Sequence, residues 1–368
     1  MRRRYKILGG VLAFGVATGC ALALYVSHDS VCRAPPALPA GVQRMKAIVY
    51  RCYGGPEVLR FDDVAKPTLA DNTVLIEVHA ASVNPLDWHY MRGLPYIMRI
   101  VAGVGAPKDI SMGVDFSGIV EAVGKNVKRF KPGDAVFGAQ HGAFGEYVSM
   151  PEDDSLTLNP RGMTFEQAAA VPIAGITALQ ALRDKGKIQR GQSVLINGAS
   201  GGVGTFGVQI AKSFGADVTG VCSTRNVQMV HSIGADHVID YTREDFTQSP
   251  QRYDLIIDTV GNHSLSQLRH VLSTTGTVVI VGGPSDGKWI APLPRLIKAK
   301  LYSKFVRQKF LFFVADVTQK DLNVLRELLQ SGKLTPVIDR RYSLSEVPAA
   351  IAYLEKGHAR GKVVISLE

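Results

Sequence analysis

One stretch constrains the fold of this chain more than any other, the segment 192–215, which reads QSVLINGASGGVGTFGVQIAKSFG. Residues 193–197 form a short aliphatic run, which predicts a buried strand. A glycine-rich turn follows, and from Val203 onward apolar residues recur at helical spacing until Gly215 provides a helix stop. A strand, a glycine turn and a helix in this order are the context that a dinucleotide-binding fingerprint requires.

The glycines of this turn have distinct physical roles. Gly198, Gly201 and Gly204 allow a tight turn, a close approach of the backbone to a pyrophosphate and close packing of the helix on the strand. The helix N-terminus then offers free N–H groups and the positive end of its dipole to the phosphates. An ordinary tight turn is the alternative, but both flanks fit, so we predict a dinucleotide site.

The loop after the next predicted strand, 217–222, selects the nucleotide. An Asp or Glu at the end of that strand would bind the ribose 2′-hydroxyl of NAD(H). The sequence instead continues with Ser223, Thr224, Arg225 and Asn226, and contains no acid there. Hydroxyls, a guanidinium and an amide suit a 2′-phosphate, whereas the alternative is a solvated loop that carries an arginine. We therefore favour NADP(H) over NAD(H).

The N-terminal residues predict a separate segment. Three arginines and a lysine precede residues 7–26, which carry no charge and match the length of about 20 residues that crosses a bilayer. The basic cluster is expected to stay in the cytoplasm, and a cleaved signal peptide is the alternative. A proline-rich spacer, 34–41, leads to a fold that begins near Met45. We predict that an N-terminal hydrophobic helix anchors the protein to a membrane, on a side left open.

Composition excludes some functions. The net charge of +10 is spread along the chain, without the concentrated basic face that nucleic-acid binding requires. The four cysteines, Cys20, Cys32, Cys52 and Cys222, are scattered and indicate neither a disulfide scaffold nor a zinc site. Residues 288–311 are basic with interleaved aromatic residues, which is typical of a helix on an anionic membrane surface or of a solvated helix with an apolar underside.

The remaining patterns predict two domains. Short strands with frequent turns fill residues 45–147, and residues 156–182 have a helical pattern. Strands alternate with a helix over residues 237–283, which indicates a parallel, doubly wound α/β sheet with its ligand at the carboxyl ends of the strands.

Seven sequence blocks together resemble the medium-chain dehydrogenase/reductase superfamily, and most of all its zinc-independent quinone oxidoreductase (zeta-crystallin-like) branch, over residues 45–368. The resemblance implies a GroES-like catalytic domain (44–170), a Rossmann NADP-binding domain (171–315) and a return to the catalytic domain (316–368), after the segment 1–43. It also implies a homodimer. The blocks are SVNPLDWHYMRG, GVDFSGIVEAVGKNV, KPGDAVFG, AAAVPIAGITALQAL, NGASGGVG, GADHVIDY and GHARGKVVIS.

The zinc ligands of the related alcohol dehydrogenases are replaced. Where those enzymes have a cysteine, this chain begins the block Asn84 to Asp87, and the histidine of their Gly-His-Glu motif is Val114, followed by Asp115. Zinc is served by thiolate and imidazole, so we predict a metal-free site. Without a Lewis acid, the expected chemistry is hydride delivery from NADPH to a small-molecule quinone or enone.

The resemblance implies roles for residues near the substrate. Asn84 matches an asparagine beside the nicotinamide whose amide can donate to the substrate oxygen, or it only shapes a turn. Tyr90 and Tyr96 supply a proton or line the pocket. Asp87 caps or braces the loop rather than reacting.

The resemblance also implies the cofactor-binding residues. They comprise the pyrophosphate turn, the 2′-phosphate loop, a tyrosine by the adenosine, the nicotinamide side and a closing C-terminal segment: Ser200, Gly201, Gly202, Val203, Ser223, Arg225, Tyr241, Gly282, Gly283, Phe312, Phe313, Val314, His358 and Arg360. The alternatives are a non-catalytic NADP(H)-binding sensor or assembly factor, and a zinc-free alcohol or aldehyde dehydrogenase.

Overall fold

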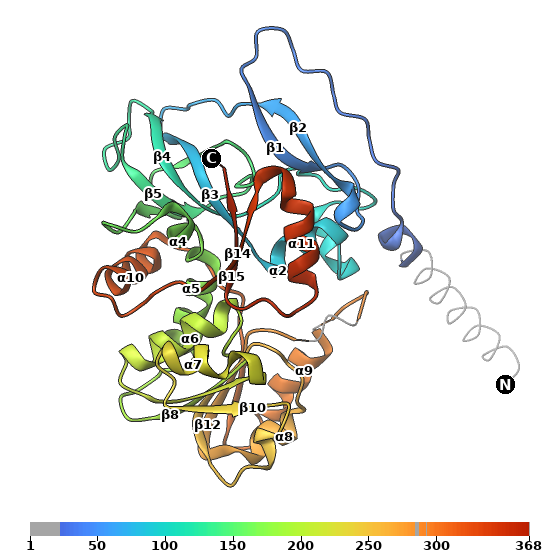
Figure 1. Cartoon of the computed structure of the whole chain (residues 1–368). Helices are drawn as coiled ribbons and strands as arrows, with labels where there is room; N and C mark the ends of the chain where they lie inside the picture. The colour runs from blue at the N-terminus through green and yellow to red at the C-terminus, as the bar shows by residue number, and fades with distance from the viewer. Residues whose placement is uncertain (1–22, 284–286, 292, 368) are drawn as a thin grey trace, which may run out of the picture.

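The computed structural model describes residues 23–283, 287–291 and 293–367. They form two lobes, one around a parallel sheet and one around a largely antiparallel sheet (Figure 1). From residue 44 the chain builds most of the antiparallel lobe, then the parallel lobe, and residues 338–366 return to the antiparallel lobe (Figure 1). The predicted α/β fold with a parallel sheet and a GroES-like domain is confirmed.

The parallel lobe contains a six-stranded sheet in the order β10-β9-β8-β11-β12-β13. Strand order reverses between β8 and β11, which places the carboxyl ends of both strands at a crevice. Its strands are β8 (Ser193–Asn197), β9 (Asp217–Cys222), β10 (His237–Asp240), β11 (Tyr253–Asp258), β12 (Leu272–Ile280) and β13 (Lys309–Phe312). Its helices are α6 (Gly202–Ser213), α7 (Val227–Ser232), α8 (Leu265–His270) and α9 (Leu293–Tyr302).

Burial explains why this lobe is stable. The strands read as continuous aliphatic runs because helices cover both faces of a parallel sheet. Phe206 and Ile210 of α6 are fully buried in one core with Ile196 of β8. Helix α10 (Gln319–Gln330) adds three leucines to the same core, although it follows the last strand of the sheet.

The antiparallel lobe contains a seven-stranded sheet in the order β14-β15-β3-β4-β5-β7, with β6 paired to β3, and a separate two-stranded sheet of β1 and β2. The C-terminal strand β15 pairs antiparallel with β3, so that Val363 lies opposite Val83. The strands are β1 (Arg44–Tyr50), β2 (Leu59–Ala65), β3 (Thr73–Val83), β4 (Asp115–Val123), β5 (Ala135–Ala139), β6 (Tyr147–Pro151), β7 (Leu156–Leu158), β14 (Ile338–Ser343) and β15 (Lys362–Ser366). The helices beside them are α2 (Pro85–Arg92), α3 (Arg99–Ala102) and α11 (Val347–Glu355). The exact domain boundaries stay predictions.

The helical pattern expected over 156–182 is only partly correct. Its first residues form β7, which pairs with β5, and the helices α4 (Phe165–Ala169) and α5 (Pro172–Leu179) follow. Pro160 and Gly162 separate the strand from the helices, because neither residue continues a helix. Residues 180–185 continue α5 as a π-helix.

The segment before β1 packs against the antiparallel lobe. The buried guanidinium of Arg99 lies 2.8 Å from the Asp29 carboxylate and donates to the carbonyl of His28. Cys32 and Cys52 form a disulfide. The spacing of the cysteines, which indicated no disulfide scaffold, did not predict this single bond, which forms because the turn after β1 returns Cys52 to the N-terminal segment.

Membrane anchoring through the N-terminus needs correction. Across residues 23–283, 287–291 and 293–367, no helix has both the length and the apolar character needed to cross a bilayer. This finding contradicts the predicted location at a membrane. Residues 1–22, which hold most of the run, lie outside the described residues.

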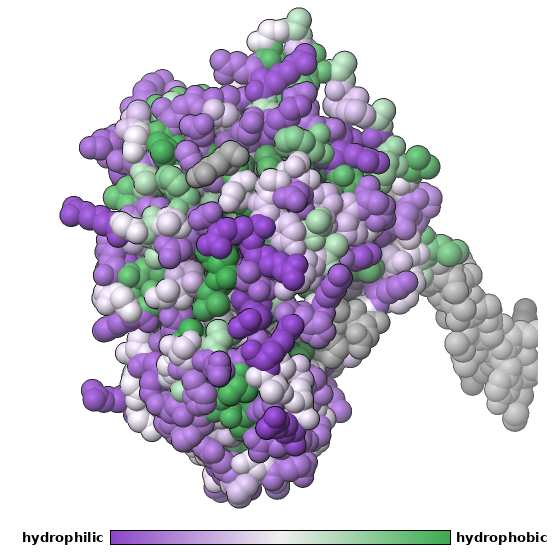
Figure 2. All heavy atoms as spheres, viewed as in Figure 1, coloured by the Kyte–Doolittle hydropathy of each residue, from purple (hydrophilic) through white to green (hydrophobic). Residues whose placement is uncertain are grey.

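On the face seen in Figure 2, hydrophilic residues predominate and hydrophobic ones form small patches.

Candidate dinucleotide and substrate site

The glycine-rich turn between β8 and α6 has the geometry of a phosphate cradle. Gly198 has a φ of +86°, and a Cβ on Gly204 would lie 2.0 Å from the Gly198 carbonyl oxygen. Both positions therefore require glycine. Gly201 is the N-cap of α6, and no side chain in the described part of the protein caps this helix start. The first N–H groups of α6 are thus available to an anion.

The loop after β9 lies beside this turn. Asn226 is buried, and its Nδ2 donates to Oγ of Ser200 at 3.0 Å and to Oγ of Ser223 at 3.3 Å. Its Oδ1 is buried and has no hydrogen-bond partner among the described residues. Arg225 is exposed and donates to the His358 carbonyl at 2.6 Å. The predicted 2′-phosphate loop therefore joins the predicted pyrophosphate turn.

The C-terminal segment contacts the same glycine-rich turn. The Gly361 N–H donates to the carbonyl of Ser200 at 2.8 Å, and Gly361 forms a parallel bridge with Gly201. The Arg360 Nε is buried and lacks a partner among the described residues. His358 and Arg360 thus lie next to the glycine turn, which the sequence alone did not establish.

The other predicted cofactor residues lie along the carboxyl edge of the sheet. Tyr241 follows β10, is 56 % exposed, and donates its N–H to the Cys222 carbonyl at 3.1 Å. Gly282 follows β12, and a Cβ there would lie 2.1 Å from the Thr259 carbonyl oxygen. Phe312 ends β13 opposite Ile280 of β12. Val203 is the second residue of α6, beside the turn, and Gly283 follows Gly282. Phe313 packs on the core, whereas Val314 is exposed.

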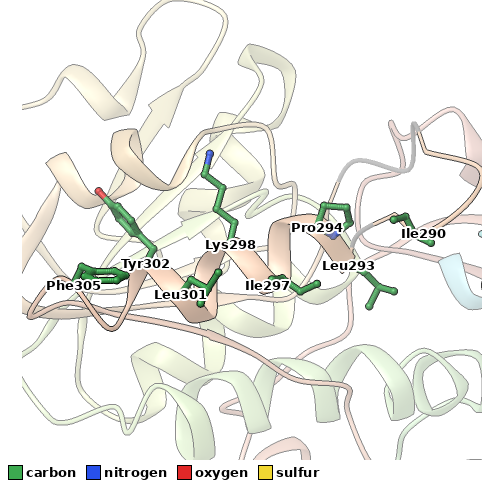
Figure 3. Close-up of a pocket in the computed structure, with 8 residues that line it drawn as sticks. All are labelled: Ile290, Leu293, Pro294, Ile297, Lys298, Leu301, Tyr302 and Phe305. Atoms are coloured by element: carbon green, nitrogen blue, oxygen red, sulfur yellow. The ribbon is translucent and has the colours of Figure 1, made fainter. Parts of the chain in front are cut away.

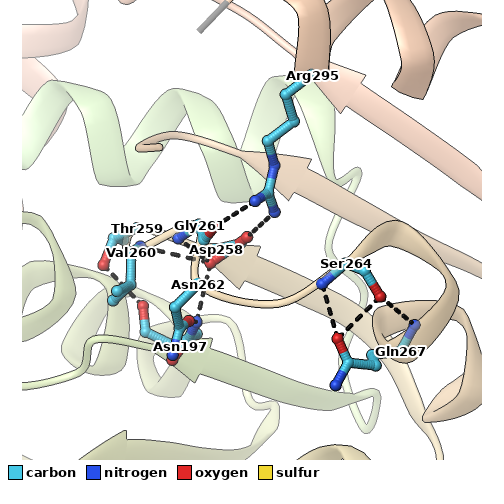
Figure 4. Close-up of polar contacts among 9 residues, drawn as sticks. All are labelled: Asn197, Asp258, Thr259, Val260, Gly261, Asn262, Ser264, Gln267 and Arg295. Atoms are coloured by element: carbon cyan, nitrogen blue, oxygen red, sulfur yellow. Dashed lines mark hydrogen bonds and ion pairs between the residues drawn. The ribbon is translucent and has the colours of Figure 1, made fainter. Parts of the chain in front are cut away.

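A polar cluster at this edge was missed from the sequence. Asn197 ends β8 and donates from Nδ2 to the Asp258 carboxylate of β11 at 2.9 Å (Figure 4). The fully buried Asp258 also lies 2.9 Å from the Arg295 guanidinium, which ties α9 to the edge (Figure 4). Both polar residues are the last of their strands, and neighbouring parallel strands end together. That rule would have found the pair.

Helix α9 presents an apolar row next to this edge. It is shorter than the amphipathic stretch expected over 288–311. The row borders an open pocket of about 620 Å³; it consists of Leu293, Ile297 and Leu301 of α9, with Ile290 before the helix and Phe305 after it (Figure 3). Before α9, the Lys288 carbonyl accepts the Tyr96 N–H at 2.7 Å, so the two lobes touch here.

The substrate side is organised around the start of α2. Asn84 is the N-cap of this helix, and its N–H donates to the Asp87 carboxylate at 2.7 Å. Asp87 therefore caps the helix, which is the role that the sequence analysis gave it in preference to a reaction with the substrate. The Asn84 Nδ2 donates to Asp115 at 2.9 Å and to the Ser82 carbonyl at 3.4 Å. Tyr90 is half-buried further along α2, with its ring 5.6 Å from that of His141.

A buried lysine completes this cluster and was missed from the sequence. The Lys362 Nζ lies 2.5 Å from Oδ1 of Asn84 and 3.4 Å from the Asp115 carboxylate. Burial raises the pKa of Asp87 to about 7 and raises the pKa of Asp115, whereas burial lowers the pKa of Lys362. Within the described ranges, no group of three His, Cys, Asp or Glu side chains is placed to hold a metal ion.

Comparisons with known proteins identify the family. Residues 70–160 match the family "Alcohol dehydrogenase GroES-like domain", and residues 233–365 match "Zinc-binding dehydrogenase". The chain is 35 % identical to the mitochondrial NAD(P)H oxidoreductase RTN4IP1 of Mus musculus, over 88 % of this chain and 89 % of that protein. It is 34 % identical to the 2-methylene-furan-3-one reductase of Solanum lycopersicum, over 87 % and 79 %.

A solved structure agrees with these sequence relatives. The quinone oxidoreductase of Coxiella burnetii matches with a TM-score of 0.78 and 32 % identity, over 89 % of this chain and all of that one. The Escherichia coli quinone oxidoreductase complexed with NADPH matches with a TM-score of 0.73 and 26 % identity, over 88 % of this chain and 100 % of that one. The chain belongs to the medium-chain dehydrogenase/reductase superfamily, in its zinc-independent quinone oxidoreductase branch.

Proposed function

We propose that this protein is an NADPH-dependent oxidoreductase that delivers hydride to a quinone or an α,β-unsaturated carbonyl. One observation carries the proposal: the hydrogen bond from Gly361 to Ser200 joins the glycine turn directly to β15, whose first residue, Lys362, contacts Asn84. A dinucleotide held at the turn would extend toward that cluster. Relatives named as quinone, alkenal/one and furanone reductases support this substrate class.

The residues of the turn fit NADP(H). When bound, the cofactor supplies a hydride from its nicotinamide ring. The first N–H groups of α6 bind the pyrophosphate, and Arg225 with Ser223 binds the 2′-phosphate by charge-assisted hydrogen bonds. The unsatisfied Oδ1 of Asn226 is a ready acceptor for a ribose hydroxyl. His358 and Arg360 close the C-terminal segment over the cofactor.

Asn84 orients the substrate. One of its N–H groups is held by Asp115 at 2.9 Å, and the other makes only a 3.4 Å contact with the Ser82 carbonyl. The second N–H, which makes the longer contact, is the one available to a substrate oxygen, where it would stabilise the negative charge that develops. Tyr90 lines the pocket or gives the proton. Catalysis rests mainly on orientation of the two reactants.

We further propose that the reaction needs no zinc and that the protein is a homodimer. Asn84 and Val114 stand where the related zinc enzymes have their cysteine and histidine ligands, and the adjacent Asp115 carboxylate already pairs with Lys362. Strand β13 is the last of the parallel sheet, which leaves one edge for a second copy. A light-scattering mass near twice 39.7 kDa is the expected result.

The purified full chain tests the function when NADPH oxidation is measured with quinones, enones and alcohols, in the presence and absence of a chelator. We expect turnover of quinones or enones that the chelator leaves unchanged. NADPH binding without turnover of any acceptor would favour the non-catalytic sensor. Turnover of alcohols alone would favour a zinc-free alcohol dehydrogenase.

A further inference from the structure

Lys362 is a buried cation at the junction of the two lobes. Only 3 % of this lysine is exposed, and Asp115, its charged partner, is fully buried. The three ammonium hydrogens face three acceptors: the Val83 carbonyl at 3.3 Å, Oδ1 of Asn84 at 2.5 Å and the Asp115 carboxylate at 3.4 Å. Because a buried charge is costly unless it is paired and hydrogen-bonded, this arrangement fixes the head of the side chain.

The ammonium group also determines which way Asn84 points. An ammonium only donates, so the atom of the Asn84 carboxamide that faces it must be the oxygen. The nitrogen then faces the Asp115 carboxylate, which only accepts when it is ionised. Two opposite charges therefore hold the two ends of one carboxamide, and a flipped carboxamide would lose both contacts.

The stem of Lys362 lies against the dinucleotide turn. Its Cδ is 3.3 Å from the place that a Cβ on Gly202 would occupy, and the preceding residue, Gly361, bonds to Ser200. One side chain thus touches the proposed phosphate cradle with its carbons and the Asn84 carboxamide with its nitrogen.

We propose that Lys362 is a positioning residue that holds the Asn84 carboxamide in a fixed orientation and at a fixed place relative to the dinucleotide turn. This inference rests on the proposed function, in which Asn84 meets the substrate oxygen at the nicotinamide end of the cofactor. Asp115 completes the arrangement from the opposite end of the carboxamide. A simple structural ion pair would stabilise the fold without any particular effect on the chemical step.

Four variants separate positioning from folding. Lys362→Met keeps the stem and removes the ammonium, and the double variant Asp115→Asn with Lys362→Met removes both buried charges. Asn84→Ala and its combination with Lys362→Met complete a double-mutant cycle. Lys333→Met, at an exposed lysine after α10, is the matched control.

We expect Lys362→Met to lower kcat by about a hundredfold, the effect of misplacing a reacting group by about 1 Å, with a smaller change in the Kd for NADPH. The charge-neutral double variant regains thermal stability but not kcat. In the Asn84→Ala background, Lys362→Met lowers kcat no further. The proposal would be overturned if the losses of kcat in Lys362→Met and Asn84→Ala multiplied in the combined variant. It would also be overturned if the charge-neutral double variant regained kcat together with thermal stability.

A readout without turnover keeps this test separate from the proposed function. If the wild-type chain reduces no acceptor, the proposed function fails, and the position of Asn84 is followed by its side-chain amide NMR signals, assigned from their loss in Asn84→Ala. We expect these signals to move in Lys362→Met and in the charge-neutral double variant, and to stay in Lys333→Met. Unchanged signals in the first two variants show that Lys362 does not hold Asn84.

Discussion

Replacement of Arg225 by alanine should change the choice of nucleotide. The guanidinium is exposed on the loop after β9 and makes a hydrogen bond to the His358 carbonyl at 2.6 Å. A hydrogen bond to a charged group contributes about 1.5–3 kcal/mol. Because solvent screens the exposed Arg225 guanidinium, we take the lower end, about 1.5 kcal/mol, for its proposed hydrogen bond to the 2′-phosphate. Loss of that bond corresponds to roughly a tenfold rise in the Kd for NADPH.

Fluorescence titration with NADPH and NADH separates the two effects of this substitution. Loss of the contact with His358 weakens both nucleotides alike, whereas loss of the 2′-phosphate contact weakens NADPH alone. Arg243→Ala is the control, because Arg243 is also exposed and pairs with Asp240, the last residue of the neighbouring strand β10. An equal change for both nucleotides, or no change for either, would refute the assignment of the 2′-phosphate to this loop.

Three further outcomes are expected. Gly204→Ala should abolish NADPH binding, because its Cβ would meet the Gly198 carbonyl oxygen at 2.0 Å, while Gly207→Ala, with a nearest contact of 3.6 Å, should bind normally in the same titration. Burial raises the pKa of Asp87 to about 7, so the folded chain holds a proton that the unfolded chain releases near pH 4. The free energy of unfolding should therefore fall as the pH rises from about 4 to 7. Urea unfolding of Asp87→Asn should show a smaller fall over the same pH range. Replacement of Cys32 and Cys52 by serine should lower the free energy of unfolding in urea by about 2–4 kcal/mol, and an unchanged midpoint would contradict the cross-link.

The nucleotide-binding core could be predicted because its signals are local. The strand 193–197 matches β8, the strand 217–222 matches β9, and α6 begins one residue before the helical pattern did. In each of these elements, the spacing of apolar residues along the sequence alone indicates whether it is a strand or a helix. By contrast, β7 is only three residues long and pairs with β5, so its strand character depends on a partner that a local pattern does not contain.

The missing parts of the candidate site depend on contacts distant in sequence. Lys362 lies 247 positions from Asp115 and 278 from Asn84, and no spacing rule connects them. Cys32 and Cys52 are joined only because the N-terminal segment packs on the lobe that Arg99 also holds. The cluster of Asn197 and Asp258 was accessible in principle, since parallel strands end at a common edge.

Isotope transfer from the cofactor is the most direct test of hydride delivery. The full chain is incubated with NADPH that carries deuterium on the transferred position of nicotinamide C4 and with an α,β-unsaturated ketone, and the product is analysed by mass spectrometry and NMR. Hydride delivery predicts one deuterium on the β-carbon of the saturated ketone. NADPH consumption with an unlabelled product, or binding of NADPH with no product at all, would contradict it.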